Sequence, residues 1–504
     1  MTTKDQKDLA YYQAIAEKIT IPTKAYINGQ WMDADSGETF ENISPIDGKK
    51  LGDIAACDRS DVNKAVSAAR AAFDSGVWSD LHPSKRGYIL KKFADLIMKH
   101  REELAVLEVL DMGKPIRDAL RIDIPGSANS IRWYGEAADK VMDEIAPTDP
   151  LAVAMVTREP IGVVGAVVPW NFPLSMMCWK LGPALATGNS IIVKPAEQSP
   201  LTALRVAELA TEAGIPDGVL NVVPGFGETA GKAIGLHMDV DGLAFTGSTE
   251  VGKYFMEYSG QSNLKRVSLE CGGKSAHIIM DDCPDLKAAA RSAAGAIFFN
   301  QGEVCTAGSR LMVHKSIKEN FVKEVIKAAS YWVPGNPLDP KTSMGAIVDK
   351  CQQDRVMDYI KQGQECGANM LIGGETAHAD TGGFYIKPTI FDGVDPNATI
   401  AQEEIFGPVL SVIEFETEEQ AIEIANGTIY GLASALWSKD INRAHRMAKA
   451  IKAGTIWVNS WDPSGDMSIP FGGYKQSGFG RDKSLHALEK YTNLKTTWVQ
   501  LQGA

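Results

Sequence analysis

Three polar side chains that lie far apart in the chain have the types needed for nucleophilic attack on a carbonyl group. Cys305 follows an expected helix, and three small residues come within the next four positions, so a ligand could approach its sulfur closely. Glu270 ends an apolar stretch before a turn, where burial would raise the pKa of the carboxyl group and suit it to be a general base. Asn171 lies between Pro169 and Pro173, and an amide fixed in this way can donate to a developing oxyanion.

Each of the three residues also has an ordinary structural interpretation. A lone cysteine is more often a small buried hydrophobic residue than a nucleophile. Glu270 could instead pair with Lys265 or Lys274, which are close in the sequence. Asn171 could cap the helix that follows it. Sequence position alone therefore leaves both interpretations open for each residue.

A second group of residues has the pattern of a dinucleotide site. Lys194 and Glu197 follow the second expected strand, where a carboxylate would accept hydrogen bonds from ribose hydroxyls and repel a 2′-phosphate, which favours NAD over NADP. Gly247 and Ser248 join a strand to a helix whose amino end would attract a pyrophosphate. The spacing from Gly247 to Gly252 departs from the usual Gly-x-Gly-x-x-Gly pattern, so its weight comes from its place at a strand–helix junction.

These residues need a scaffold that brings them together, and the sequence from residue 161 onward predicts one. Short apolar runs alternate with helical stretches, and several runs are apolar on both faces, as in a parallel sheet buried between helices. The expected strands cover 161–168, 191–193, 219–223, 243–245, 266–269 and 276–280. One expected helix ends near 186, and the others cover 202–213, 228–234, 250–258 and 285–299. We therefore predict an α/β fold in which an irregular loop, 300–310, carries Cys305.

Two regions lie outside this alternation. Residues 60–120 have apolar side chains at helical spacing, which predicts amphipathic helices packed on the rest of the protein. The tail 494–501 alternates in the manner of a strand, and we expect it to pair with another segment or another subunit.

The composition limits the class of protein and its partners. The chain has 504 residues, about three times a typical domain, so two or three domains are expected. The net charge of −12 argues against nucleic acid as a partner, because an acidic surface repels phosphate groups. The seven cysteines have no metal-binding spacing, so we expect reduced thiols and no metal. A charged amino terminus and the lack of a long apolar run predict a cytoplasmic protein that does not enter a membrane.

Seven short segments, taken in order, give the chain a family resemblance. The segments are Pro-Trp-Asn-Phe-Pro at 169–173, Lys-Pro-Ala-Glu at 194–197, Phe-Thr-Gly-Ser-Thr at 245–249, Leu-Glu-Cys-Gly-Gly-Lys-Ser at 269–275, Gly-Glu-Val-Cys at 302–305, Glu-Glu-Ile-Phe-Gly-Pro at 403–408 and Pro-Phe-Gly-Gly-Tyr-Lys at 470–475. With them the chain resembles the aldehyde dehydrogenase superfamily over nearly its whole length, and within it the γ-glutamyl-γ-aminobutyraldehyde dehydrogenases, which are similar to ω-amino- and guanidinobutyraldehyde dehydrogenases.

The resemblance implies a domain organisation. It places a Rossmann-type, parallel-sheet NAD-binding domain at 1–138 and 161–272, and a second α/β catalytic domain at 273–481. A β extension at 139–160 and the tail 482–504 would be oligomerisation segments. Members of the family are commonly dimers or tetramers, so a homo-oligomer is expected.

The resemblance also implies roles for individual residues. Cys305 matches the nucleophile, Glu270 the general base and Asn171 the oxyanion donor, joined by the backbone N–H of Cys305. Lys180 and Asp482 match a secondary proton relay, although many members have Glu at the second position. The cofactor contacts implied by the resemblance are Val168, Pro169, Trp170, Lys194, Glu197, Gly227, Gly247, Ser248, Gly252, Leu269, Glu404 and Phe406.

The expected reaction is the NAD-dependent oxidation of an aldehyde to a carboxylic acid, through a thiohemiacetal and a thioester on Cys305. Relatives that transfer the acyl group to coenzyme A lack a Glu at the position of Glu270, so its presence favours hydrolysis. Competing hypotheses are a thiol hydrolase, which would need a partner histidine, and a binding protein without activity. The binding-protein hypothesis expects Cys305, Glu270 or Asn171 to be lost, and all three are present.

The substrate is predicted from the expected channel and from one acidic loop. By family position the channel entrance involves Phe172, Met176, Trp179, Val304, Thr306, Trp461 and Phe471, although such residues are also typical of a core. Asp462 and Asp466 lie in the loop 461–467, which has no basic residue and could attract an ammonium or guanidinium group, or could simply be solvated. We expect a linear ω-amino or γ-glutamylamino butyraldehyde; the alternative is a broad-specificity aliphatic or betaine-type aldehyde dehydrogenase.

Overall fold

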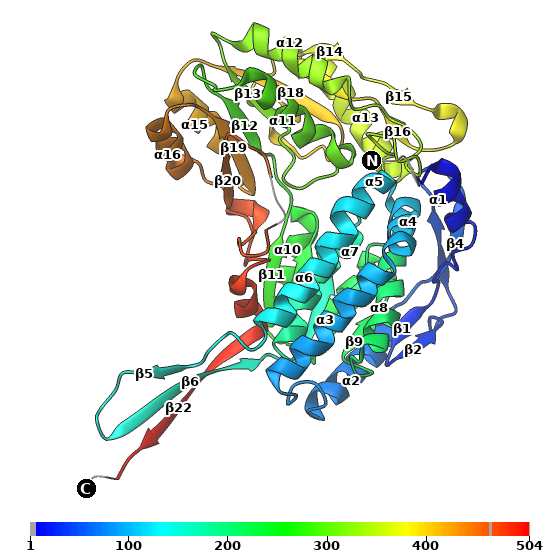
Figure 1. The fold of residues 1–504 in the computed structure, drawn as a ribbon, viewed down its shortest axis with the longest axis vertical. Helices are drawn as coiled ribbons and strands as arrows, with labels where there is room; N and C mark the ends of the chain where they lie inside the picture. Colours follow the sequence, from blue (N-terminus) through cyan, green and yellow to red (C-terminus); the bar gives the residue numbers. More distant parts are fainter. Residues whose placement is uncertain (1–6, 463–465, 503–504) are drawn as a thin grey trace, which may run out of the picture.

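The computed structural model describes residues 7–462 and 466–502, which form two α/β parts and a projecting β arm (Figure 1). An eight-stranded sheet lies at the centre of the first part and a seven-stranded sheet at the centre of the second. The predicted α/β fold class is confirmed, since each part alternates strands with covering helices. No helix in the described residues has the length and apolar character that crossing a membrane requires.

The first sheet is parallel through its five central strands. Its order is β2-β1-β9-β8-β7-β10-β11-β21, and β7 and β8 are buried along their whole length, which is the double-sided burial that their sequences predict. The strands are β1 (Ala25–Ile27), β2 (Gln30–Met32), β7 (Val163–Val167), β8 (Ser190–Lys194), β9 (Leu220–Val222), β10 (Gly242–Thr246), β11 (Arg266–Glu270) and β21 (Gly478–Phe479).

Helices cover both faces of the first sheet. Alternate residues of β7 point to opposite sides, so that Val164 packs into one core and Val163 into the other. The first core is closed by α3 (Pro83–Lys99), α4 (Arg101–Met112), α6 (Ile124–Ala137), α7 (Pro173–Ala186) and α8 (Leu201–Ala213), and the second by α2 (Arg59–Asp74), α9 (Lys232–Leu236) and α10 (Thr249–Gln261). The amphipathic helices expected in 60–120 are therefore present as α2, α3 and α4.

The second part has the same layered construction. Its sheet has the order β14-β17-β18-β13-β12-β19-β20, with only β14 antiparallel to its neighbour. The strands are β12 (Ala276–Ile279), β13 (Arg310–His314), β14 (Asn369–Ile372), β17 (Thr389–Asp392), β18 (Val409–Phe415), β19 (Ala433–Trp437) and β20 (Thr455–Val458). The helices are α11 (Leu286–Phe298), α12 (Lys318–Ala329), α13 (Lys350–Glu365), α14 (Thr399–Gln402), α15 (Glu418–Asn426) and α16 (Ile441–Ala450).

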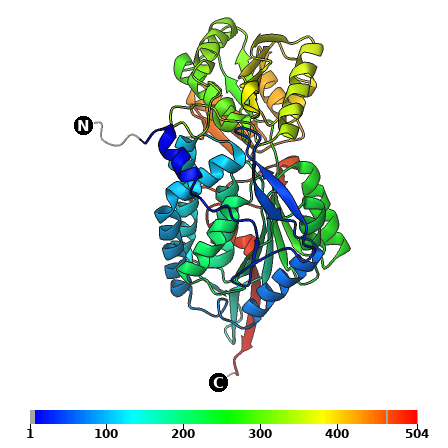
Figure 2. The ribbon, with the colours of Figure 1, turned by 90° about the vertical axis from the view of Figure 1, so that its right-hand side faces the viewer.

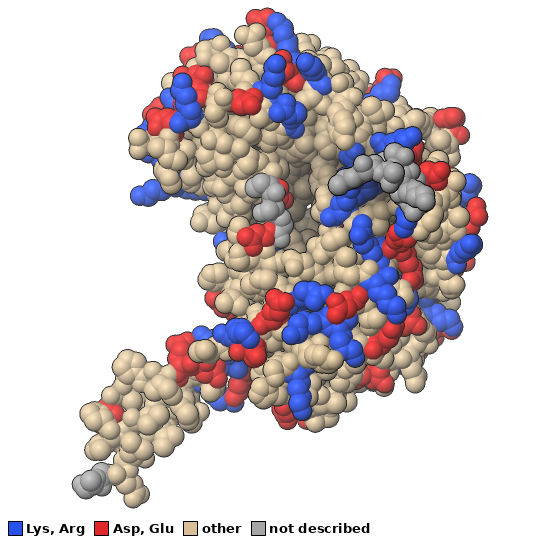
Figure 3. Space-filling model, viewed as in Figure 1, with Lys and Arg blue, Asp and Glu red and all other residues tan. Residues whose placement is uncertain are grey.

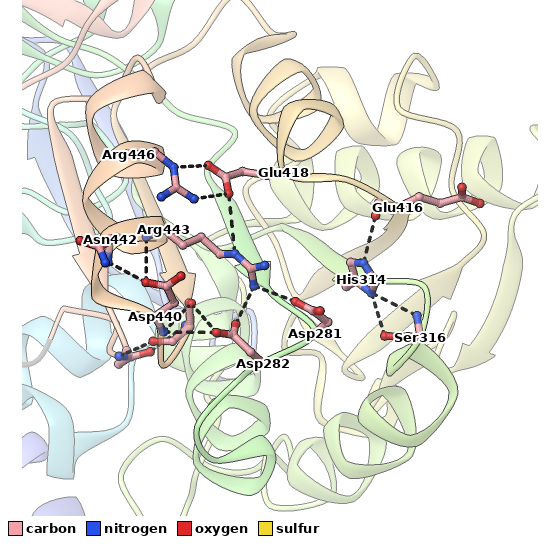
Figure 4. Close-up of polar contacts among 12 residues, drawn as sticks. Asp281, Asp282, His314, Ser316, Glu416, Glu418, Asp440, Asn442, Arg443 and Arg446 are labelled. Carbon is pink, nitrogen blue, oxygen red and sulfur yellow. Dashed lines mark hydrogen bonds and ion pairs between the residues drawn. The ribbon is translucent and has the colours of Figure 1, made fainter.

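An ion-pair network fixes two of these helices to the sheet (Figure 4). Arg443 of α16 donates to Asp281 at 2.7 Å and to Asp282 at 3.0 Å, both just beyond β12. Glu418 of α15 lies 3.6 Å from the same guanidinium group and also pairs with Arg446 at 3.0 Å. The planar guanidinium thus joins three elements that are far apart in the sequence.

The arm is a three-stranded antiparallel sheet that extends away from the body (Figures 1 and 2). Strand β22 (Thr492–Gln500) pairs along all nine residues with β6 (Ala152–Pro160), and β5 (Glu144–Ala146) lies on the other side of β6. The expected pairing of the tail with another segment is confirmed. Several large apolar side chains of the arm are exposed, among them Ile145 at 70% and Trp498 at 54%, and the outer end of the arm carries few charges (Figure 3).

The chain returns to the first part earlier than the sequence predicts. Strand β21 pairs with β11 of the first sheet, although the catalytic domain was expected to continue to residue 481. The 3-10 helix Leu485–Tyr491 packs into the first core, so only residues from Thr492 onward belong to the arm. Residues 478–491 therefore lie against the first part, and the division into functional domains stays a prediction.

The remaining described α-helices and strands are short. They are α1 (Leu9–Ala16), β3 (Thr39–Ile43), β4 (Lys50–Ala55), α5 (Ile116–Asp118), β15 (Thr376–Ala377) and β16 (Tyr385–Ile386).

Candidate active site

A cavity of about 1000 Å³ brings together the three residues singled out for carbonyl chemistry. Asn171 reaches it from the connection between β7 and α7, Glu270 from the end of β11, and Cys305 from the loop after α11. Figure 3 shows the surface hollowed between the two parts of the molecule. The carboxyl edge of the first sheet therefore faces the Cys305 loop, as expected for a ligand site of a parallel sheet.

The loop before Cys305 has an unusual backbone that other segments hold in place. Asn300, Gln301 and Gly302 have φ angles of 49°, 57° and 77° in succession, which for the two non-glycine residues costs on the order of 1 kcal/mol each. The side chain of Gln301 accepts from the N–H of Gly345 at 2.9 Å. The Glu303 carboxylate accepts from the N–H of Val348 at 3.0 Å. These buried bonds offset the strain and fix the position of the thiol.

Asn171 is held by this loop and does not cap a helix. Its side-chain N–H donates to the carbonyl of Glu303 at 2.9 Å, and Asn300 donates to the Asn171 carbonyl at 3.2 Å. Helix α7 begins after Phe172 without any side-chain cap, so the capping interpretation is wrong. Since the amide carries two N–H groups, one remains for an oxyanion in the cavity.

Glu270 is buried, and neither of its carboxyl oxygens has a hydrogen-bond partner among the described residues. The side chain of Lys265 donates to the carbonyl of Gly235 at 2.6 Å, and that of Lys274 makes no bond with Glu270. The pairing interpretation is therefore wrong. Burial, followed by the negative charge of Asp482, raises the pKa of Glu270 well above its ordinary value. A carboxyl group with a raised pKa is suited to accept a proton near neutral pH.

The thiol of Cys305 is protonated in this environment. Burial raises its pKa to about 12, and the nearby charges of Glu404 and Glu270 act in the same direction. A thiolate therefore needs either a proton acceptor or a cation brought in by a ligand. Glu270, in the wall of the same cavity, is the acceptor that the chain itself provides.

A buried charged cluster lies behind Glu270. The ammonium group of Lys180 contacts Oδ2 of Asp482, and that of Lys490 contacts Oδ1 of the same carboxylate. Although burial opposes ionisation, the two lysines hold the pKa of Asp482 below its ordinary value. The structure thus brings Lys180 and Asp482 together, and it adds Lys490, whose part the sequence analysis missed.

The cavity continues along residues expected to hold a dinucleotide. The hydroxyl of Ser248 accepts from the N–H of Val251 at 3.2 Å and caps α10. Outside the cavity wall, at the end of β8, Lys194 pairs with Glu197 at 2.8 Å. Trp170 meets Phe406 edge-on, with ring centres 5.1 Å apart.

The position of the Glu404 carboxylate depends on a glycine that lies next to it in space. This carboxylate accepts from the N–H of Gly273 at 2.8 Å. A Cβ atom on Gly272 would lie 2.0 Å from the same carboxylate, so a larger residue there would displace the Glu404 side chain. The helix amino end at Ser248, together with acidic groups that can accept from ribose hydroxyls, fits a dinucleotide.

Not every expected cofactor residue reaches the cavity. Pro169, Trp170, Gly247, Ser248, Glu404 and Phe406 line it. The others, which lie outside its wall, are Val168, Lys194, Glu197, Gly227, Gly252 and Leu269. A Cβ atom on Gly252 would lie 2.9 Å from the sulfur of Cys271, and Leu269 is buried in the core. Packing therefore accounts for the residue types at these two positions.

Part of the cavity wall is apolar. All seven expected channel residues line the cavity, which are Phe172, Met176, Trp179, Val304, Thr306, Trp461 and Phe471. Asp462 also lines the cavity, but Asp466 is exposed outside it and accepts from Ser468 at 2.8 Å. Residues 463–465 of the same loop lie outside the described residues.

The charged side chains near the acidic loop are not all acidic. Lys483 is buried in the cavity wall, and its ammonium group lies 5.5 Å from the centre of the Trp179 ring. The loop 461–467 taken by itself gives no sign of this cation, because Lys483 lies outside it in the sequence. The signal was available, since Lys483 directly follows Asp482, a residue already assigned to the site.

Comparisons with known proteins agree with this arrangement. A model described as "Aldehyde dehydrogenase family" matches residues 31–497. The chain is 53% identical over 495 residues to the NADP/NAD-dependent aldehyde dehydrogenase PuuC of Escherichia coli K12, covering 98% of this chain and 99% of that one. It is 47% identical to an aminoacetaldehyde dehydrogenase of Pseudomonas aeruginosa, covering 97% of this chain and 98% of that one.

Two solved structures extend the likeness to three dimensions. An indole-3-acetaldehyde dehydrogenase in complex with NAD⁺ superimposes with a TM-score of 0.97 and 58% identity, covering 98% of this chain and 100% of that one. A γ-glutamyl-γ-aminobutyraldehyde dehydrogenase from Burkholderia cenocepacia J2315 gives the same TM-score of 0.97 with 56% identity and the same coverage of 98% and 100%.

Proposed function

The chain belongs to the aldehyde dehydrogenase family of NAD(P)-dependent oxidoreductases, and we propose that it oxidises its aldehyde through a covalent intermediate on Cys305. The observation that carries this proposal is the meeting of Cys305, Asn171 and Glu270 in one cavity. No histidine lines the described part of that cavity, which disfavours a thiol hydrolase that would depend on a Cys–His pair.

In the first half of the proposed mechanism, the sulfur of Cys305 bonds to the aldehyde carbon. Glu270 takes the thiol proton, either directly or through one water molecule. The free N–H of Asn171 donates to the oxygen as it becomes negative, in a pocket where the amide is already fixed by Glu303. A bound dinucleotide supplies the hydride acceptor.

In the second half, Cys305 carries the acyl group as a thioester. Glu270 takes a proton from water, whose oxygen then attacks the thioester carbon, and the thiol leaves as the free acid forms. Buried Lys180 and Asp482 lie behind Glu270 and offer a route by which its proton can leave. Asn171 again holds the oxyanion.

The test of this proposal is Cys305→Ala. The variant should lose essentially all NADH formation with every aldehyde. The other described cysteine of the cavity wall, Cys271, is packed into a hydrophobic core and is therefore not placed to replace it. Absorbance of NADH measures it, and melting temperature checks the fold. Turnover above a few per cent of wild type would refute a covalent route through Cys305.

We also propose that NAD is preferred over NADP. Glu197 is partly exposed and ion-paired with Lys194, so its carboxylate would repel a 2′-phosphate while the lysine is already occupied. The ratio of kcat/KM for NAD to that for NADP should exceed one in the wild type and fall in Glu197→Gln. An unchanged ratio in this variant would contradict the role of Glu197.

For the substrate we propose a linear butyraldehyde with an ω-amino or γ-glutamylamino group. The apolar part of the cavity wall suits the carbon chain, and two charged residues of the wall, Asp462 and Lys483, suit an ammonium and a carboxylate respectively. The γ-glutamylamino form carries both groups at its far end. The names of two relatives point the same way, an aminoacetaldehyde dehydrogenase and a γ-glutamyl-γ-aminobutyraldehyde dehydrogenase. A panel of kcat/KM values decides between these aldehydes and unsubstituted aliphatic ones.

The arm supports a proposal about assembly. Its two edge strands expose Ile145, Leu494 and Trp498 on a sheet that extends away from the body (Figure 1). Exposed apolar groups of this size are typical of an interface, so we infer a homo-oligomer, a dimer or a tetramer. Sedimentation equilibrium measures its size. The assignment of domain functions and a cytoplasmic location stay predictions.

A further inference from the structure

Lys490 has no assigned role, yet it completes a buried cluster beside Glu270. The carboxylate of Asp482 is fully buried and receives one ammonium group on each oxygen, Lys180 on one side and Lys490 on the other. Lys180 comes from α7, Asp482 follows β21, and Lys490 lies in the 3-10 helix Leu485–Tyr491. Three separate elements therefore converge on one carboxylate.

We propose that Lys490 is a positioning residue that supplies the second positive charge of this cluster and thereby allows Glu270 to ionise and act as the base. The inference rests on the proposed function, because it assumes that Glu270 is the base. Lys490 does not line the cavity. It acts through Asp482, which does.

The charges explain why a second lysine is needed. With both lysines protonated and Asp482 ionised, the cluster carries a net charge of about +1. When Glu270 ionises, the buried group as a whole becomes neutral. Without Lys490 the same event would leave a net negative charge inside the protein, which is costly in a medium of low polarity.

The geometry also shows how Lys490 is kept in place. Only 11% of its side chain is exposed. The carbonyl of the next residue, Tyr491, accepts from the side chain of Asn189 at 3.0 Å and from the N–H of Ile161 at 3.2 Å. The backbone at Lys490 is thus fixed where β22 begins, and Asp482 is held by both of its oxygens.

The other polar groups around the cluster do not replace this charge. Tyr134 of α6 donates to the carbonyl of Ser484 at 3.0 Å, and burial raises the pKa of both Tyr134 and Tyr491, so both stay neutral. Arg481 is positive, but it is only half-buried and donates to backbone carbonyls. Its charge is therefore more strongly screened by solvent than that of Lys490.

The experiment measures how the steady-state rate after the first NADH burst depends on pH, in Lys490→Met, Asp482→Asn and the double variant. Removing the lysine should move the acidic limb of the profile to higher pH, and removing the aspartate should move it to lower pH. Each displacement should be on the order of one pH unit, as for a unit charge several Å away at an effective dielectric constant of about 20. The double variant has the original net charge, so its limb should return towards that of the wild type.

Controls separate this electrostatic role from a structural one. Lys490→Arg keeps the charge and should keep the wild-type limb. Lys323→Met removes a lysine that pairs with Glu319 at 2.7 Å on the surface of α12, and it should change nothing. The NADH burst and the melting temperature show that each variant is folded and can be acylated.

Two results distinguish failure of this inference from failure of the proposed function. Glu270→Gln that keeps the full steady-state rate overturns the proposed function itself. If Glu270→Gln is inactive but the limbs of Lys490→Met and Asp482→Asn stay in place, or move in the same direction, only the role of Lys490 is overturned. If these two variants lose steady-state rate but their acidic limbs do not move in opposite directions, the role of Lys490 is likewise overturned.

Discussion

Removing the amide of Asn171 tests the site most directly, because its effects on activity and on stability can be separated in advance. The Asn171→Ala variant loses the N–H that we assign to the oxyanion. Removal of one such preorganised donor typically costs about 3–4 kcal/mol in the transition state, so kcat/KM should fall by roughly 10²–10³-fold.

The expected loss of stability is much smaller, and the structure gives the reason. The carbonyl of Glu303, which accepts from Asn171 at 2.9 Å, also accepts from Asn300 at 3.1 Å, so it keeps a partner in the variant. One net hydrogen bond is lost, which costs about 1 kcal/mol. Urea unfolding measures this difference.

A matched control is Asn426→Ala, far from the cavity. The Asn426 side chain donates to the carbonyl of Ala450 at 3.0 Å and accepts from the N–H of Lys452 at 2.8 Å. Because two side-chain hydrogen bonds are removed, this variant should lose at least as much stability as Asn171→Ala while keeping its kcat/KM. The reasoning is refuted if folded Asn171→Ala stays within about tenfold of wild type, or if Asn426→Ala loses as much activity.

Two further predictions follow from burial and backbone geometry. Glu270→Gln should form at most one NADH per active site in the burst, and its steady-state rate should fall by about 10²–10⁴-fold. Because burial raises the pKa of Glu270 in the folded state, this carboxyl group destabilises the fold at pH values above its ordinary pKa. The variant should therefore be more stable than wild type at pH 8, and the difference should vanish at pH 4; thermal unfolding at both values checks the sign. Gly302→Ala should lose at least about 2 kcal/mol in urea unfolding, since φ is 77° and its Cβ would lie 2.2 Å from the carbonyl of Gly407. Gly367→Ala, with φ of 85° and open space around it, should lose only about 1 kcal/mol, and equal losses would contradict the clash.

The sequence by itself determined the fold class and the family. Strands that are apolar on both faces, such as 163–167 and 190–194, have to be covered by helices on each side, and this local pattern is independent of what the strands pair with. The short segments around Asn171, Glu270 and Cys305 likewise carry the family resemblance in their local order. Both kinds of information are contained in neighbouring residues.

Only the tertiary structure decided between the alternatives for individual side chains. Whether Asn171 caps a helix or meets the Cys305 loop depends on how the two parts of the molecule pack, and the bond to Glu303 spans 132 residues. The positions of Lys483 and Lys490 were decided in the same way, by the return of the chain to the first sheet through β21. Charges that are distant in sequence come together only in the folded chain, because burial and electrostatic interaction depend on distance in space and not along the chain.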